Sequence, residues 1–302
     1  MNKKNFAITT LFTILLLLTS CGDANRRYVR DAVRIMDKQG IFAEGPEWDA
    51  AKEKALSATP TSIQEAQEVI KEALKVAGGK HSFLKTEEAV AKDASSEWPA
   101  PEVTILDGIA IVKLPPFSGN QEEGIKYANT VLEAIPDTVQ GVVIDLRDNT
   151  GGNMYPMIAA VHRFISADDL LRFRTRKRTQ WIQLPFVLQG AGVARQERIA
   201  CPVALLTNEW TASSGEATLL CFRGLDYARV FGSPTAGYAS ANQPFTLADG
   251  AQLVLTTGCD VARTGEVFCD DPIDPDVFTQ TPVEDAVAWI NGAMMNNNLQ
   301  TK

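Results

Sequence analysis

Histidine is scarce in this chain of 302 residues, because His81 and His162 are the only two. A site that needs three imidazole ligands is therefore excluded, and any histidine chemistry has two candidates. Positive charge is also in deficit, since 29 Lys and Arg face 37 Asp and Glu and leave a net charge of −8. Neutralising a phosphate backbone requires a basic excess, so the composition argues against nucleic acid as a partner.

The apolar run near the amino terminus, residues 6–18, is shorter than the roughly 20 residues that a bilayer-spanning helix needs. It ends in Leu18-Thr19-Ser20-Cys21, which resembles a bacterial lipobox, in which the cysteine is acylated and becomes the mature N-terminus. We therefore predict a lipoprotein signal peptide over residues 1–21 and membrane attachment through lipidated Cys21. An ordinary secretory signal cut near Ser20 is the alternative. Both predict the cell envelope. Gly22 favours the outer membrane over the inner one, and we expect a lipid-anchored protein that faces the periplasm or lies at the outer membrane of a Gram-negative bacterium.

Cysteine is sparse as well. Apart from Cys21, the chain has four: Cys201, Cys221, Cys259 and Cys269. An even number in an oxidising compartment predicts two disulfides. Of the three possible connectivities, the local pairs Cys201–Cys221 and Cys259–Cys269 are favoured because they close short loops. The C-x-x-C pattern that zinc sites use does not occur, so the sequence predicts no metal and no cofactor.

The first part of the mature chain has the pattern of amphipathic helices. Apolar residues recur at three- and four-residue steps from Tyr28 to Ile35 and from Ile63 to Ala77. They predict a small helical subdomain over residues 24–86, in which a glycine pair ends the last helix and delivers His81 to a loop or strand start. Residues 87–101 have the composition of a linker.

From residue 103 the pattern changes. Short apolar runs at 108–113, 141–146 and 202–207 alternate with helical patterns at 124–135, 155–165 and 213–223. This alternation predicts an α/β core with largely parallel strands over residues 103–290.

Two of the predicted strands lead into segments that can carry chemistry. The strand ending at residue 146 runs into Gly151 and Gly152, where glycine lets backbone N–H groups approach an anion. The strand 202–207 leads to Ser213 at a helix start, a place where a lone serine is more often only an N-cap. Parallel strands bring both segments to one sheet edge, so the serine can act as nucleophile beside backbone oxyanion donors.

Four motifs follow one another along the core. They are Asp145-Leu-Arg-Asp-Asn-Thr-Gly-Gly-Asn153, Thr211-Ala-Ser-Ser-Gly-Glu216, Phe231-Gly-Ser-Pro-Thr-Ala-Gly237 and Ile273-Asp-Pro-Asp-Val277. Together they resemble the C-terminal processing peptidase and tricorn protease family, over residues 27–290. The resemblance implies a ClpP/crotonase-like α/β fold with Ser213 as nucleophile. It also implies an oxyanion hole made by the N–H of Gly151 or Gly152 and the N–H of Ser214.

The chain departs from the processing peptidases at their lysine base, because Tyr238 occupies that position. The resemblance therefore implies the tricorn-like branch, whose base is an upstream histidine that matches His81. His162 lies in an apolar helical run and is expected to be a packed or a surface helix residue. A PDZ insertion is not expected, since fewer than twenty residues separate Leu84 from Val103.

In the tricorn-like branch an acidic residue from a late loop completes the relay. Asp271 is favoured here by spacing, with Asp270 and Glu266 as alternatives. The sequence thus predicts a lipid-anchored envelope serine endopeptidase that acts on exposed or C-terminal peptide segments. Two other functions are open: a non-catalytic protein that binds a peptide or hydrophobic ligand on the same scaffold, and an esterase or other acyl hydrolase.

Overall fold

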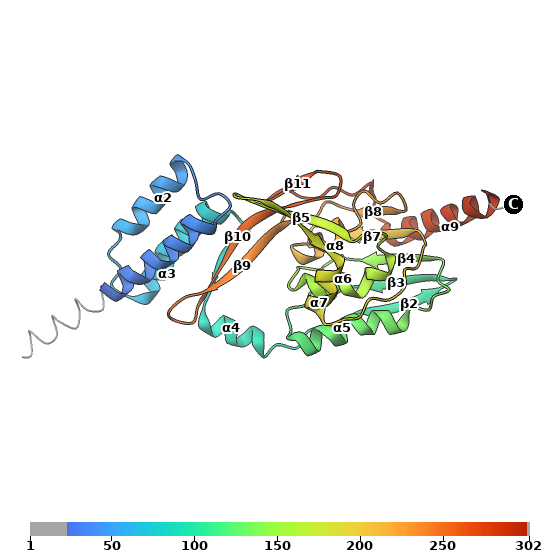
Figure 1. Ribbon diagram of the computed structural model, residues 1–302, viewed down its shortest axis with the longest axis horizontal. Helices are drawn as coiled ribbons and strands as arrows, with labels where there is room; N and C mark the ends of the chain where they lie inside the picture. The colour runs from blue at the N-terminus through green and yellow to red at the C-terminus, as the bar shows by residue number, and fades with distance from the viewer. Residues whose placement is uncertain (1–22, 301–302) are drawn as a thin grey trace, which may run out of the picture. The chain divides into compact units, whose positions relative to one another are not determined.

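The computed structural model describes residues 23–300, which form two compact units (Figure 1). The first unit comprises residues 23–91 and 242–257, and the second comprises residues 92–241 and 258–300. Strands β9 (Ser240–Thr246) and β10 (Gln252–Val261) each begin in one unit and end in the other. Among the described residues, no helix has the length and apolar character needed to cross a membrane. The predicted signal peptide and Cys21 lie outside the described residues.

The first unit is mainly helical. It contains a helix over residues 23–39, α2 (Pro46–Ser57), α3 (Ile63–Gly78) and the short strand β1 (Phe83–Lys85). Ser62 caps α3, because its side chain accepts the Glu65 N–H at 3.1 Å. The buried face of α3 carries Ile70 and Leu74, which pack into the core of this unit.

Residues 242–257 belong to this unit, whereas the sequence places them in the α/β core. Leu253 and Leu255 are fully buried in the core of the helical unit, and residues 252–254 pair antiparallel with β1. The alternating pattern of a strand does not reveal which distant surface it covers. Residues 87–101, predicted as a linker, contain the helix α4 (Glu87–Ala94).

The second unit carries the parallel sheet. Its elements are β2 (Glu102–Leu106), β3 (Ile109–Lys113), α5 (Gln121–Ala134), β4 (Gly141–Asp145), α6 (Met154–Val161), a 3₁₀ turn (His162–Phe164), β5 (Asp169–Thr175), β6 (Thr179–Gln183), α7 (Leu184–Ala191), β7 (Val203–Thr207), α8 (Ser214–Leu220), β8 (Ala228–Gly232), β11 (Val267–Phe268), β12 (Val277–Phe278) and α9 (Pro282–Gln300). The strand order is β12-β8-β7-β4-β3-β2, and only the β2–β3 pair is antiparallel. The predicted α/β fold class is confirmed.

Alternation along the strands gives this sheet two apolar faces. Val142 and Ile144 of β4 point into the cluster formed with α5, α6 and α8. Val143, between them, points to the opposite face and packs with Ala286 and Ile290 of α9. Helices therefore cover both faces, as a parallel sheet requires.

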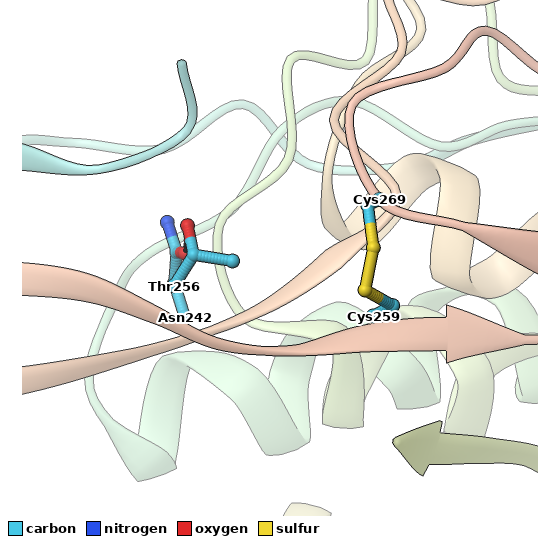
Figure 2. Close-up of a disulfide and its surroundings, with 4 residues drawn as sticks. All are labelled: Asn242, Thr256, Cys259 and Cys269. Carbon is cyan, nitrogen blue, oxygen red and sulfur yellow. Dashed lines mark hydrogen bonds between the residues drawn. A yellow bond between two sulfur atoms is a disulfide. The ribbon is translucent and has the colours of Figure 1, made fainter. Parts of the chain in front are cut away.

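A second, antiparallel sheet was not predicted. Strand β5 pairs with β6 and with residues 258–261 of β10, and β11 pairs with the same end of β10. The disulfide Cys259–Cys269 joins β10 to the residue after β11, with the two Cα atoms 4.6 Å apart (Figure 2). This bridge is one of the two local pairs that the sequence favours.

The other pair, Cys201–Cys221, is wrong. Both thiols are free and buried in the α/β core. Cys221 Sγ lies 3.2 Å from the carbonyl oxygen of Ala217, one turn earlier in its own helix. Burial raises the pKa of Cys201 to about 11 and that of Cys221 further. Short separation in sequence says nothing about side-chain direction, and a strand and a helix lie between these two cysteines.

Denatured, unreduced protein should therefore contain two reactive thiols. They belong to Cys201 and Cys221, which burial in the core protects in the folded state. Titration with a thiol reagent in denaturant, on protein exported through the envelope, measures this number. A Cys201→Ser/Cys221→Ser variant should give no thiol. A count of zero or four in the parent would contradict the assignment of one disulfide.

Candidate active site

Ser213 stands at a sharp backbone turn between β7 and α8. Its φ of 53° and ψ of −114° lie where non-glycine residues are rarely found. Hydrogen bonds hold the residues before it. The Ala212 N–H donates to the Asn149 carbonyl oxygen at 2.9 Å, and Thr211 Oγ1 donates to the Leu146 carbonyl oxygen at 2.9 Å. The turn is thereby fastened to the segment that follows β4.

The glycine turn after β4 packs directly against Ser213. Gly151 and Gly152 have φ values of 100° and 119°, which favour glycine strongly. A Cβ atom on Gly151 would lie 2.7 Å from Ser213 Cβ, and one on Gly152 would collide with the carbonyl group of Phe117. The structure thus brings together the two segments that the sequence places at one sheet edge.

Only one of the two glycines offers its N–H to a ligand. The Gly151 N–H donates to Asn149 Oδ1 at 2.9 Å. The N–H groups of Gly152 and Ser214 have no acceptor within residues 23–300. Ser214 Oγ donates to the Gly152 carbonyl oxygen at 2.6 Å, which ties the two residues together. Of the alternatives in the sequence, this geometry favours Gly152 over Gly151 as the partner of Ser214.

The Glu216 side chain holds the residues around Ser213 in place through hydrogen bonds. It is fully buried, and four donors converge on its carboxylate. Oε2 accepts the N–H groups of Ser213 at 2.7 Å and Tyr238 at 2.8 Å. Oε1 accepts Thr235 Oγ1 at 2.5 Å and the Gly237 N–H at 3.0 Å. One side chain therefore joins the serine turn to residues 235–238.

A second buried carboxylate, Asp260, lies close enough to Glu216 to affect its charge. Burial and the negative charge of Glu216 raise the pKa of Asp260 well above its usual range. Burial also raises the pKa of Glu216, but its four hydrogen bonds oppose that effect. A proton on either Glu216 oxygen would face two donors, whereas Asp260 Oδ1 has no hydrogen-bond partner among the described residues. Glu216 is therefore the ionised member of the pair, and Asp260 carries the proton.

His81 lies in the turn between α3 and β1, as the sequence predicts. Its carbonyl oxygen accepts Asn242 Nδ2 at 2.8 Å. Asn242 Oδ1 accepts Thr256 Oγ1 at 2.8 Å, and Figure 2 shows these two side chains near the disulfide. The buried Ser82 hydroxyl accepts the Thr256 N–H at 2.8 Å. Burial, followed by the charge of Lys80, lowers the pKa of His81 to about 4. The imidazole is therefore neutral at pH 7.

His162 has both ring nitrogens occupied. Nδ1 lies 2.6 Å from the Ala159 carbonyl oxygen, and Nε2 accepts the Gln196 N–H at 2.9 Å. Burial lowers its pKa, and the side chain is 2% exposed. Of the two expectations for His162, a packed residue is confirmed.

The three acidic candidates lie on either side of β11: Glu266 precedes this strand, and Asp270 and Asp271 follow it. Glu266 forms an ion pair with Arg223 at 2.9 Å, and this guanidinium lowers the pKa of Glu266. Asp271 is exposed, and Asp270 follows the disulfide-bonded Cys269. The ion pair with Arg223 makes Glu266 a weaker candidate for the acid. Asp271, with Asp270 as the alternative, stays a prediction. Within residues 23–300, no group of three or more His, Cys, Asp or Glu is arranged to hold a metal ion.

Sequence reasoning missed the roles of Glu216 and Asn149. A signal for Glu216 was present, because a serine at a helix start followed three residues later by glutamate is the capping-box spacing. Asn149 is fully buried, with Nδ2 donating to the Leu114 carbonyl oxygen at 2.8 Å and Oδ1 accepting the Gly151 N–H. No local pattern distinguishes that asparagine from an ordinary turn residue.

Known proteins resemble this chain over most of its length. The model of peptidase family S41 matches residues 108–279. A nisin-resistance protein of Lactococcus lactis is 32% identical over 275 residues, which cover 88% of this chain and 86% of that protein. A CtpA-like serine protease of Staphylococcus aureus is 26% identical over 175 residues, 58% of this chain and 34% of that longer protein. The solved structure of a lipoprotein from Streptococcus agalactiae has a TM-score of 0.82 at 30% identity, covering 89% of this chain and 96% of its own.

The chain belongs to peptidase family S41 and is a serine-type peptidase.

Replacing Glu216 by Gln should damage the site far more than replacing Asp260 by Asn. The Gln amide would place N–H donors against two of the four donors that now bind Glu216. Loss of these bonds should displace the serine turn and lower kcat/KM by roughly 10- to 100-fold. Hydrolysis of a casein-type substrate measures the loss.

The Asp260→Asn variant is the matched control, because it keeps the shape of a carboxyl that already carries a proton. Its kcat/KM should stay close to that of the parent. Equal losses in the two variants, with both proteins folded by circular dichroism, would contradict the assignment of the charge to Glu216.

Proposed function

We propose that this S41 peptidase is a lipid-anchored endopeptidase of the cell envelope, of the tricorn-like branch, with Ser213 as nucleophile and His81 as base. The observation that carries the proposal is the Ser213 turn. Ser213 is a non-glycine residue at φ 53°, a backbone conformation that costs stability. It packs on the glycine turn, and the N–H groups of Gly152 and Ser214 beside it lack acceptors among the described residues. Packing of the core alone does not require this strain. Such strain is typical of a nucleophile presented to substrate.

In the proposed reaction, Ser213 Oγ attacks the carbonyl carbon of the scissile peptide bond. His81 takes the hydroxyl proton as the new C–O bond forms, and the carbonyl oxygen becomes an oxyanion. The Gly152 and Ser214 N–H groups donate to that oxyanion. His81 then gives the proton to the leaving amine, and water repeats the sequence on the acyl-enzyme. Asp271, or alternatively Asp270, holds the imidazolium in this scheme.

The envelope location is supported by two observations. The chain carries the lipobox-like Leu18-Thr19-Ser20-Cys21, and a similar solved structure is that of a lipoprotein. The proposed substrates are exposed or C-terminal segments of peptides and proteins in this compartment. The nisin-resistance protein of Lactococcus lactis matches 88% of this chain, so nisin is the first peptide to assay. An esterase activity would use the same groups, and no observation favours it over peptide hydrolysis.

The Ser213→Ala variant should lose hydrolysis while it keeps its fold. Removing the nucleophile should lower kcat by roughly 10³-fold or more. A fluorophosphonate probe should label the parent but should not label Ser213→Ala. A folded parent that resists the probe would favour the non-catalytic binding protein. Unchanged turnover in Ser213→Ala would remove this serine from the mechanism.

The activity should rise with pH through a pKa of about 4, below the ordinary histidine value. The base must be neutral, so activity is lost as pH falls through the pKa of His81, which burial and Lys80 lower to about 4. The acid limb of kcat/KM against pH measures it.

The Lys80→Gln variant should move this limb to higher pH, because it removes one of the two causes of the shift. Lys54→Gln, on a different helix and paired with Glu72, should leave the limb in place. His81→Ala should be nearly as inactive as Ser213→Ala. Full activity in His81→Ala would overturn the tricorn-like assignment.

A further inference from the structure

The β5–β6 hairpin and the helix that follows it form a basic segment in an acidic chain. Residues 170–196 hold six of the 29 Lys and Arg and none of the 37 Asp and Glu. Five of those cations lie in β5, in β6 or in the turn between them: Arg172, Arg174, Arg176, Lys177 and Arg178. The positive charge that the whole chain lacks is thus concentrated in one hairpin.

The hairpin turn is a rigid support for these cations. The Thr175 N–H donates to the Arg178 carbonyl oxygen at 2.9 Å. Thr175 Oγ1 accepts the N–H groups of Lys177 at 3.2 Å and Arg178 at 3.1 Å. The turn residues are therefore held in place before any ligand binds, which lowers the entropic cost of binding.

The two faces of the hairpin differ. Leu171 and Ile182 are buried in the core of the α/β unit. Arg172 pairs with Trp181 across the strands, on the opposite face, and its guanidinium lies 4.9 Å from the Trp181 ring centroid. Arg174 shares that face, since it lies two residues from Arg172 along the same strand. The outward face therefore combines cations with an aromatic ring.

The outward cations lack partners of opposite charge. Arg174, Lys177 and Arg178 are exposed and form no ion pair within residues 23–300. Buried or half-buried arginines elsewhere in the unit do have partners, such as Arg163 with Asp137 and Arg223 with Glu266. Among the described residues, the charges of Arg174, Lys177 and Arg178 are therefore left for an anion from outside the chain.

Exposed aromatic side chains belong to the same segment. Trp181 is 38% exposed on β6, and Phe186 is 55% exposed in the first turn of α7. Phe186 contacts Tyr155 edge to face, with ring centroids 5.9 Å apart. Aromatic rings beside cations suit the headgroup level of a bilayer, where the rings meet the apolar boundary and the cations meet the lipid phosphates.

We propose that the β5–β6 hairpin docks the protein onto a membrane surface that carries anionic phospholipid. Arg174, Lys177 and Arg178 would contact the lipid phosphates, and the Trp181 ring would lie at the headgroup level. The docking rests on the proposed envelope location but not on the catalytic residues. It would supply a second, electrostatic attachment to the membrane that Cys21 reaches through its acyl chains.

The test is vesicle binding by unacylated protein of residues 22–302, which contains all the residues of the three hydrophobic cores. The protein should sediment with vesicles of phosphatidylcholine and phosphatidylglycerol at low salt, and 0.5 M NaCl should release it. It should not sediment with pure phosphatidylcholine. An Arg174→Gln/Lys177→Gln/Arg178→Gln variant should bind the anionic vesicles roughly tenfold more weakly or worse.

Lys54→Gln/Lys71→Gln is the matched control, because Glu72 and Glu68 already neutralise these lysines. It should bind like the parent, and so should Ser213→Ala, which separates this proposal from the catalytic one. Trp181→Ala should bind several-fold more weakly and keep its salt dependence.

Three results would overturn the proposal. The first is equal binding of the parent and the triple variant to anionic vesicles. The second is salt-sensitive self-association of the parent that the triple variant loses, which would make a second copy of the chain the partner. The third is binding to a soluble polyanion such as heparin without binding to vesicles.

Discussion

The hydrogen bonds of the Glu216 carboxylate are the constraint on which the candidate site depends. The backbone of Ser213 sits at a positive φ, which the chain would relax if nothing held it. Glu216 accepts the N–H of that residue and also the N–H groups of Gly237 and Tyr238. Burying a carboxylate is costly unless hydrogen-bond donors surround it. Here the donors belong to the serine turn and to residues 235–238, the segments that form the candidate site. The four hydrogen bonds thus offset the cost of burying the charge, and they also fix the positions of the segments that supply the donors.

Of the two buried carboxyl groups, Glu216 and Asp260, only one carries a negative charge. Two ionised carboxylates this near to each other in a dry interior would repel, so one of them keeps its proton. The donors decide which one, because all four face Glu216 and Asp260 Oδ1 has none within residues 23–300. Tyr238, which by sequence resemblance takes the place of the lysine base of the processing peptidases, donates its N–H to Glu216 Oε2.

The sequence predicts those features whose causes are local. The strands β4 and β7 are continuous apolar runs followed by turn residues, so their direction and the meeting of Gly151 with Ser213 follow from parallel pairing. Long-range pairing leaves no such trace. Residues 252–254 pair with β1 and residues 258–261 pair with β5. The alternating pattern of β10 is the same in both parts, so it does not indicate which strand each part pairs with. The predicted disulfide between Cys201 and Cys221 is wrong for a similar reason, because spacing in the sequence does not fix side-chain direction.

Net charge is a sum over the chain, and that sum conceals how charge is arranged. The net charge of −8 means that the chain as a whole has no excess of basic residues. A surface potential, however, is felt within about 8–10 Å at physiological salt, so a partner at the β5–β6 hairpin senses Arg174, Lys177 and Arg178 and not the distant carboxylates. The same acidic remainder would be repelled by anionic lipid. Attraction confined to one hairpin and repulsion elsewhere together favour a single orientation of the α/β unit on the membrane, with the hairpin toward the lipid.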